Sequence, residues 1–214
     1  NTAPTVSSTN PADLATGVSV STNVSATFSE EADSSTINSS SFTLYQGLTQ
    51  VTGAVSYSSA TQTATFNPDS DLLYSTTYTA TVTTAVKDLA QNSLASNKVW
   101  SFTTQAAPDI TAPTTTLSTS PVAPDGLNGW FVTIPSITLT PDEAATTYYS
   151  WVSSTGPWTT YASSFNAPTG ENTLYYYSVD SSSNTEAVKS QLFKVDTTVN
   201  PPTLNPIDSD NVTN

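Results

Sequence analysis

The chain has 214 residues and a formal net charge of −13, and it contains no Cys, His, Met or Arg. These absences exclude thiol chemistry, imidazole catalysis and soft-metal ligation. Nucleic acid and anionic membrane surfaces are poor partners for this chain, and we expect no nucleic-acid binding, because both need a cationic surface that four lysines do not provide. No apolar run approaches the roughly 20 residues that span a bilayer, so we expect no membrane insertion and regard cations as the natural small ligands.

Residues 1–105 show the short alternating segments that are typical of an antiparallel β-sandwich with one buried face per strand. Residues 29–37 interrupt this pattern, and Asp33 or Ser34 is suited to cap a single helical turn there. Tyr78 is placed as in a tyrosine corner, in which a phenol ties the preceding loop to the strand. We expect strands near residues 4–8, 17–29, 41–46, 50–58, 61–67, 76–86 and 98–104.

The second half of the chain, residues 106–198, ends in the same way as the first. Residues 76–104 and 172–198 each contain a strand, a tight turn and a second strand, and both turns contain Asp and, four positions later, Asn. Asn128-Gly129 predicts a further hairpin in the second half. The repeat predicts two related β domains of about one hundred residues each. The residues that define the two turns are Asp88, Asn92, Asp180 and Asn184.

A third domain start follows the two predicted domains. Thr and Pro precede a short extended run at residues 1–6, at residues 109–115 and more loosely at residues 196–204. We therefore expect residues 199–214 to be an extended arm that docks on another copy of the chain, or the beginning of a further repeat. Its prolines keep it out of a central strand.

The segments of the first half resemble, in order and spacing, the bacterial Ig-like domain family first known from S-layer proteins. They include TATFNP, YTATV, VKDLAQNSLA and WSFTT, and the resemblance covers residues 3–104. Residues 109–198, with DGLNGWFVTIPSITLT and LYYYSVDSSSNTEAV, are similar to another Ig-like repeat of bacterial and archaeal surface proteins and secreted hydrolases. The resemblance implies an all-β fold of tandem immunoglobulin-like, Greek-key β-sandwiches. It also implies a structural spacer that has no catalytic residues.

The residues themselves offer little for catalysis. A serine nucleophile needs a base, and none of the four lysines lies beside a serine motif. The acidic clusters are Glu30, Glu31 and Asp33, and Asp142 with Glu143, but neighbouring residues on a strand point to opposite faces and make poor catalytic pairs. We therefore expect no enzyme and no catalytic residues.

Calcium is the one cofactor that the sequence suggests. Asp180, Asn184 and Glu186 offer hard oxygen ligands within one loop, and Asp88 with Asn92 offers fewer. The alternative is that Asp and Asn are present because their side chains bond to their own backbone and favour tight turns. Without calcium at this loop, we expect no cofactor.

Aromatic residues suggest a second ligand class. Trp130, Trp151 and Trp158 could stack on sugars, as in a carbohydrate-binding module of a secreted glycoside hydrolase or an adhesin. The alternative is that these rings fill a sandwich core. The sugar-binding hypothesis requires at least two of the three to lie exposed and coplanar.

The sequence favours a non-catalytic structural module of an extracellular stalk, S-layer or filament that assembles head to tail. Its expected partners are other copies of itself or further domains of the same surface protein, together with glycans under the alternative. Three sites match the N-glycosylation pattern, and such matches are also expected by chance in a chain so rich in Ser and Thr. They are Asn23, Asn38 and Asn211.

Overall fold

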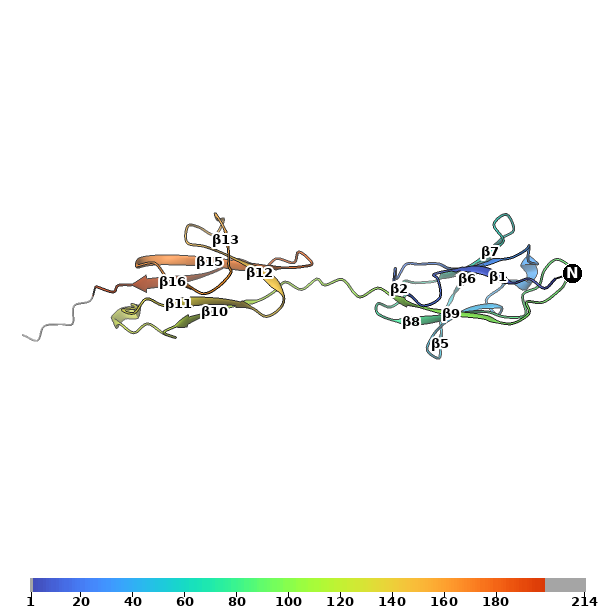
Figure 1. Cartoon of the computed structure of the whole chain (residues 1–214), viewed down its shortest axis with the longest axis horizontal. Helices are drawn as coiled ribbons and strands as arrows, with labels where there is room; N and C mark the ends of the chain where they lie inside the picture. The colour runs from blue at the N-terminus through green and yellow to red at the C-terminus, as the bar shows by residue number, and fades with distance from the viewer. Residues whose placement is uncertain (1, 199–214) are drawn as a thin grey trace, which may run out of the picture. The chain divides into compact units, whose positions relative to one another are not determined.

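A computed structural model of the chain describes residues 2–198, which form two compact units (Figure 1). Unit 1 is Asn1–Ala107 and unit 2 is Pro108–Asn214. The predicted arm and Asn211 lie outside the described residues. Each unit consists of two packed β-sheets, so the predicted class, all-β with Ig-like sandwiches, is confirmed.

One sheet of unit 1 has four strands, and alternation along its two central strands gives it one buried face. For example, Val24, Ala26 and Phe28 are buried while the residues between them are half-buried. The strands pair antiparallel. In sheet order they are β1 (Val6–Asn10), β3 (Val24–Phe28), β7 (Thr63–Pro68) and β6 (Gly53–Ser58).

The other sheet of unit 1 has five strands. It is antiparallel apart from the pairing of its first two strands, which run parallel along one side of the sandwich. In sheet order they are β2 (Ala15–Val18), β9 (Lys98–Thr104), β8 (Thr77–Val82), β4 (Phe42–Gln46) and β5 (Thr49–Gln50).

Two local predictions for unit 1 are confirmed. The 3₁₀ helix η1 (Ser34–Thr36) is capped by Asp33, whose side chain accepts a hydrogen bond from the Ser35 N–H. The Tyr78 hydroxyl accepts the Leu73 N–H at 2.9 Å, which is the predicted tyrosine corner. The single strand expected over residues 17–29 is wrong, because β2 and β3 belong to different sheets.

Unit 2 packs a three-stranded sheet against a four-stranded sheet. The first contains β10 (Thr115–Ser120), β11 (Ser136–Pro141) and β14 (Phe165–Asn166). The second contains β13 (Thr159–Thr160), β12 (Ala145–Ser150), β15 (Gly170–Asp180) and β16 (Lys189–Val195). All named strand pairs of unit 2 are antiparallel.

The hairpin predicted at Asn128-Gly129 is wrong. Both residues have the positive φ that such turns require, 56° and 78°. They lie, however, in the 3₁₀ helix η2 (Leu127–Gly129), within the long connection between β10 and β11. The sequence therefore predicts the tight turn at Asn128-Gly129 correctly, but the residues on either side of it do not form paired strands.

Candidate functional site

The two Asp-to-Asn turns have the same hydrogen-bond geometry. In unit 1, Asp88 Oδ1 accepts the Asn92 N–H at 2.8 Å and Oδ2 accepts Asn92 Nδ2 at 2.7 Å. In unit 2, the matching distances between Asp180 and Asn184 are 2.7 Å and 2.8 Å. The Asp N–H also donates to the Asn carbonyl in both. Each carboxylate therefore shapes its own turn, the role that the alternative to calcium gives these residues.

These hydrogen bonds favour the ionised carboxylates. The Asn92 side chain is the main cause that holds the pKa of Asp88 below its ordinary value, against an opposing effect of burial. For Asp180, burial is the largest single influence and opposes ionisation. The bonds from Asn184 and from the backbone of the turn together outweigh it, and the pKa of Asp180 is lowered.

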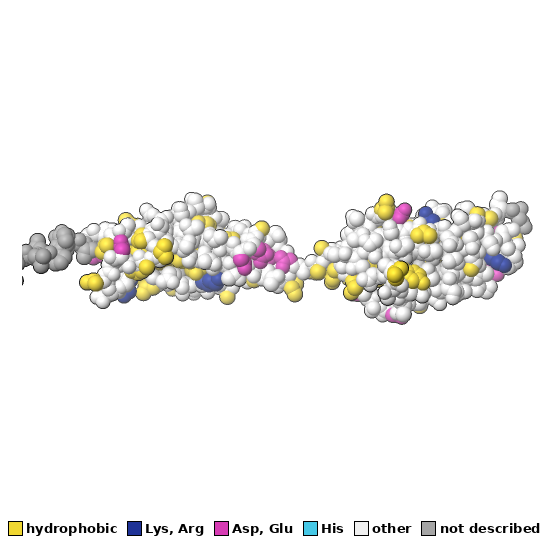
Figure 2. Space-filling model, turned by 90° about the horizontal axis from the view of Figure 1, so that it is seen from below, with side chains coloured by type: hydrophobic (Ala, Val, Ile, Leu, Met, Phe, Trp, Pro, Cys, Tyr) yellow, Lys and Arg dark blue, Asp and Glu magenta, His cyan; other side chains and the backbone are white. Residues whose placement is uncertain are grey.

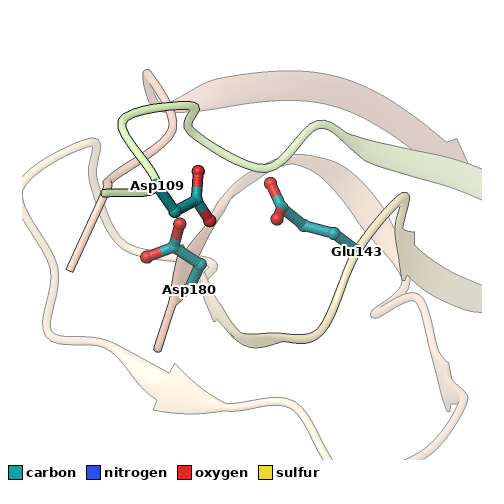
Figure 3. Close-up of side chains that lie close together, drawn as sticks. All are labelled: Asp109, Glu143 and Asp180. Atoms are coloured by element: carbon teal, nitrogen blue, oxygen red, sulfur yellow. The ribbon is translucent and has the colours of Figure 1, made fainter. Parts of the chain in front are cut away.

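Unit 2 adds two carboxylates to Asp180. One oxygen each of Asp109, Glu143 and Asp180 lie within 4.8 Å of one another (Figure 3). Asp109 precedes β10, and the Asn184 side chain fixes this segment by donating to the Asp109 carbonyl at 3.1 Å. Glu143 comes from the loop between β11 and β12. Its pKa is raised, first by burial and then by the neighbouring carboxylates of Asp109, Asp180 and Asp142.

This acidic cluster differs from the ligand set expected from the sequence. Asp180 belongs to both sets, Asn184 lies beside it as a hydrogen-bond donor, and Glu186 is outside the cluster. Oxygen ligands of one calcium ion can lie at most about 5 Å apart, twice the Ca–O distance, so a separation of 4.8 Å is near that limit. Asp109 could not be predicted as a member of this cluster, because no local sequence pattern links it to a turn some seventy positions later.

Glu186 instead joins the two sheets of unit 2. Its carboxylate accepts the N–H of Thr115 on β10 at 2.8 Å and that of Ser178 on β15 at 3.2 Å. It also forms an ion pair with Lys189, whose ammonium group donates to the Thr115 carbonyl. The Ser178 hydroxyl bonds to the hydroxyls of Thr115 and Thr147. We call these five residues the polar clamp.

The electrostatics of the polar clamp favour a charged Glu186. The Glu186 side chain is 6% exposed, and burial, the largest influence, opposes its ionisation. Hydrogen bonds from Lys189 and Thr115 outweigh burial, so the pKa of Glu186 is lowered. Its oxygens are thus already occupied by protein donors, and Glu186 acts as a structural link between the sheets.

The three tryptophans considered for sugar binding do not form a shared platform. Trp151 packs edge-on against Phe193 in the core cluster, with ring centroids 5.8 Å apart. Trp158 stands edge-on to Tyr177 at 4.7 Å, and the Lys194 ammonium lies 6.0 Å from the Trp130 ring centroid. All three are half-buried, and no ring contact within residues 2–198 joins two of them. This geometry does not favour a stacking surface for sugars.

Two of the three expected glycosylation sites lie within the described residues. Asn23 and Asn38 are both exposed. Among the described residues, no helix has the length and apolar character needed to cross a membrane.

The fold defines the class of the protein: two successive Ig-like β-sandwich units, each with a strand–turn–strand closure. The sequence profile of the family described as bacterial Ig-like domain matches residues 1–104. Unit 1 therefore belongs to the bacterial Ig-like domain family, as its resemblance predicted. The match ends before unit 2, whose resemblance to a second repeat stays a prediction.

Solved structures that are similar to this chain include a structure of surface layer protein SbsC, domains 1–6. It is 16% identical with a TM-score of 0.39, and the alignment covers 91% of this chain and 26% of that chain. The N-terminal part of the bacterial S-layer protein SbsC gives the same identity and TM-score and is covered to 44%. Fibronectin(III)-like modules of Clostridium thermocellum CbhA are 12% identical with a TM-score of 0.27, at 90% and 94% coverage.

The chain thus spans between about a quarter and less than half of these S-layer chains. At such identities and TM-scores, the similarities carry no information on function. No curated protein sequence matches the chain significantly.

Proposed function

We propose that the chain is a non-catalytic structural module of a bacterial cell-surface protein, in which Ig-like sandwiches act as extracellular spacers. The family match of unit 1 is the observation that supports this proposal most directly. The acidic, Thr-rich composition without His, Cys or Arg is consistent with it. The hydrogen bonds of the buried carboxylates are consistent with a structural role, because Asp88, Asp180 and Glu186 each accept hydrogen bonds from within their own unit.

Two measurements test this proposal. Mild protease treatment of intact source cells should release peptides of the chain, whereas peptides that appear only after lysis would contradict a surface location. The purified chain should also leave panels of glycosidic, ester and peptide substrates unchanged. Rapid turnover of one defined substrate, lost on heat unfolding, would contradict the non-catalytic role.

We also propose that the chain associates with further copies of itself in a head-to-tail manner. The support is that Ig-like sheets expose edge strands, which pair readily with extended segments of another chain. Sedimentation velocity over a concentration series tests this directly. A single monomeric species up to millimolar concentration would contradict self-association while leaving the spacer role intact.

A further inference from the structure

In unit 1, backbone hydrogen bonds join the segment in which the chain enters to the strand in which it leaves. β2 runs parallel to β9, the last strand of the unit, with Ala15 opposite Phe102 (Figure 1). The Leu14 N–H donates to the Ser101 carbonyl at 2.7 Å, and the Asp13 carboxylate accepts the Ser101 N–H at 3.0 Å. When two parallel strands are pulled in opposite directions along their axes, the bonds between them are loaded together. The β2–β9 ladder therefore resists tension along the chain.

Unit 2 has a single residue in place of this ladder. Among the described residues, Phe131 alone pairs with β16 on the side away from β15, through an isolated parallel bridge to Val195. The Phe131 N–H donates to the Lys194 carbonyl at 2.8 Å, and the Asp196 N–H donates to the Phe131 carbonyl at 2.9 Å. Because Phe131 follows β10 in the chain, tension that enters unit 2 from its start reaches β10 before it reaches this bridge.

The polar clamp lies at the point where tension first reaches β10. Thr115 is the first residue of β10, and its N–H and carbonyl bind the side chains of Glu186 and Lys189. Glu186 lies in the turn between β15 and β16, and Lys189 is the first residue of β16, the last strand of the unit. The clamp thus connects the start of the first strand to the hairpin that ends the unit, through side chains where unit 1 uses a strand ladder.

A second contact holds the chain to the same hairpin just before β10. The Asn184 side chain, which belongs to the turn between β15 and β16, donates to the Asp109 carbonyl at 3.1 Å. Figure 2 shows Asp and Glu side chains gathered at the end of unit 2 where the chain enters, which is the end that carries the acidic cluster of Asp109, Glu143 and Asp180. Both contacts between the entering chain and the last hairpin therefore lie at this end.

We propose that the polar clamp is the contact that resists tension in unit 2, in the place that the β2–β9 ladder takes in unit 1. Tension that enters before β10 acts on Thr115 and passes through Glu186 and Lys189 into β16, from which the chain leaves the sandwich. The inference rests on the proposed spacer role, since a surface spacer transmits tension between its ends.

The chemistry of the clamp suits this role. Glu186 forms an ion pair with Lys189 and accepts the N–H groups of Thr115 and Ser178, which lie on different sheets. Hydrogen bonds to a charged acceptor are stronger than those between neutral groups. The Glu186 side chain is 6% exposed, so water does not readily replace these bonds as they stretch. The clamp is therefore a strong joint that is protected from solvent.

Pulling single chains in two directions tests the proposal, because the chain has no cysteine and handles can be attached at chosen pairs of introduced cysteines. T111C with T198C loads unit 2 across the clamp, and it leaves out the bond to Asp109, which precedes Thr111. V152C with T198C loads the four-stranded sheet without crossing β10, since Val152 follows β12. Thr111, Val152 and Thr198 are all exposed.

E186A removes the central acceptor of the clamp. At equal force, it should make unit 2 unfold about tenfold faster or more across the clamp, and the change in the other direction should be at least about threefold smaller. E171A is the control, because Glu171 pairs with Lys194 on the surface. A group that stabilises the fold but carries no tension would speed unfolding equally in both directions. Equal changes, or an effect of E171A as large as that of E186A, would overturn the proposal.

A milder pair of variants decides the question if E186A does not fold. K189M removes the ion pair and the bond to the Thr115 carbonyl, while Glu186 keeps the two backbone N–H groups. K194M is its control, because the Lys189 and Lys194 side chains are 35% and 33% exposed. K189M should speed unfolding more across the clamp than in the other direction, and K194M should not. An equal effect of K189M in both directions would overturn the proposal.

These measurements separate the clamp from the spacer role on which it rests. Pulling experiments use the purified chain, whereas surface exposure and the absence of turnover are measured independently. A chain that resists tension through the clamp but is absent from the cell surface would contradict the spacer role alone. A surface-exposed chain whose variants respond equally in both directions would contradict the proposed role of the clamp alone.

Discussion

Unit 1 and unit 2 share the geometry of their closing turns, but the residues that pair beside each turn are apolar in unit 1 and polar in unit 2. In unit 1 the Leu94 N–H donates to the Val86 carbonyl at 2.9 Å, and in unit 2 the Glu186 N–H donates to the Ser178 carbonyl at 3.0 Å. Each pair lies at the same positions relative to the turn Asp. An apolar pair in unit 1 therefore corresponds to a polar, charged pair in unit 2.

The difference follows the size of the two cores. Within residues 2–198, unit 1 buries 18 apolar residues, among them Phe42 and Trp100, and unit 2 buries eight. A smaller apolar core leaves more of the stabilisation to hydrogen bonds, and the polar clamp supplies them between β10 and β15. The comparison teaches that the same turn can close an apolar sandwich or a partly polar one, and in the polar clamp the buried Glu186 carboxylate is paired with the N–H groups of Thr115 and Ser178.

The largest loss of stability is expected when the glutamate of unit 2 is introduced at the matching position of unit 1. L94E puts a carboxylate at a position that is 4% exposed, with no lysine placed as Lys189 is in unit 2. We expect unit 1 to lose about 4 kcal/mol or more of stability. L89E is the control, because Leu89 lies in the same loop and is 63% exposed. Hydrogen exchange read by mass spectrometry for each unit measures the loss, and equal stability of the two variants would contradict it.

A smaller effect is expected when the polar clamp is broken in unit 2. E186A leaves the N–H groups of Thr115 and Ser178 without their acceptor and should cost unit 2 about 2–4 kcal/mol. E171A is the matched control, since Glu171 pairs with Lys194 on the surface and is 55% exposed. Removing that pair should cost less than about 1 kcal/mol. Denaturant unfolding of the two variants should separate them, and equal midpoints would mean that the clamp adds no stability.

Much of this architecture could be predicted from the sequence, because strand alternation and turn residues are local signals. The tyrosine corner at Tyr78 and the cap at Asp33 were found in that way. The break between β2 and β3 was missed because apolar residues continue through the turn, where Val20 is also buried. Alternation alone does not show that a chain changes sheets.

The candidate sites were less predictable, since they depend on contacts between distant segments. The partner of Glu186 in β10 lies 71 positions away, and nothing in the loop sequence marks its carboxylate as a link between sheets. Asp109 and Asp180 likewise meet only after folding.

Lowering the pH should reduce the stability that Glu186 gives to unit 2. Its pKa is lowered in the folded state from an ordinary value of 4.5, so its contribution to stability is complete above that pH. The contribution is lost as the pH falls through the folded pKa. The melting midpoint of unit 2 in E186Q should therefore lie below that of the wild type at pH 7, and the gap should close below about pH 4.5. The transition of unit 1 is the internal control, and a constant gap down to pH 3 would contradict the assignment.

The smallest effect is expected from calcium, and it tests whether the acidic cluster of unit 2 does more than shape a turn. Both turn carboxylates already accept two bonds from Asn, but only Asp180 has Asp109 and Glu143 nearby. Because the oxygens of Asp180 are occupied and the ligand spacing is near its limit, calcium should bind weakly. At concentrations near the dissociation constant, the stabilisation is about 0.4 kcal/mol. Millimolar calcium should thus raise the melting midpoint of unit 2 slightly relative to chelator, leave unit 1 unchanged, and lose its effect in E143Q. Overlapping curves with calcium and chelator would mean that the turn chemistry is the same in both units, and a shift in both units would mean general screening of the net charge.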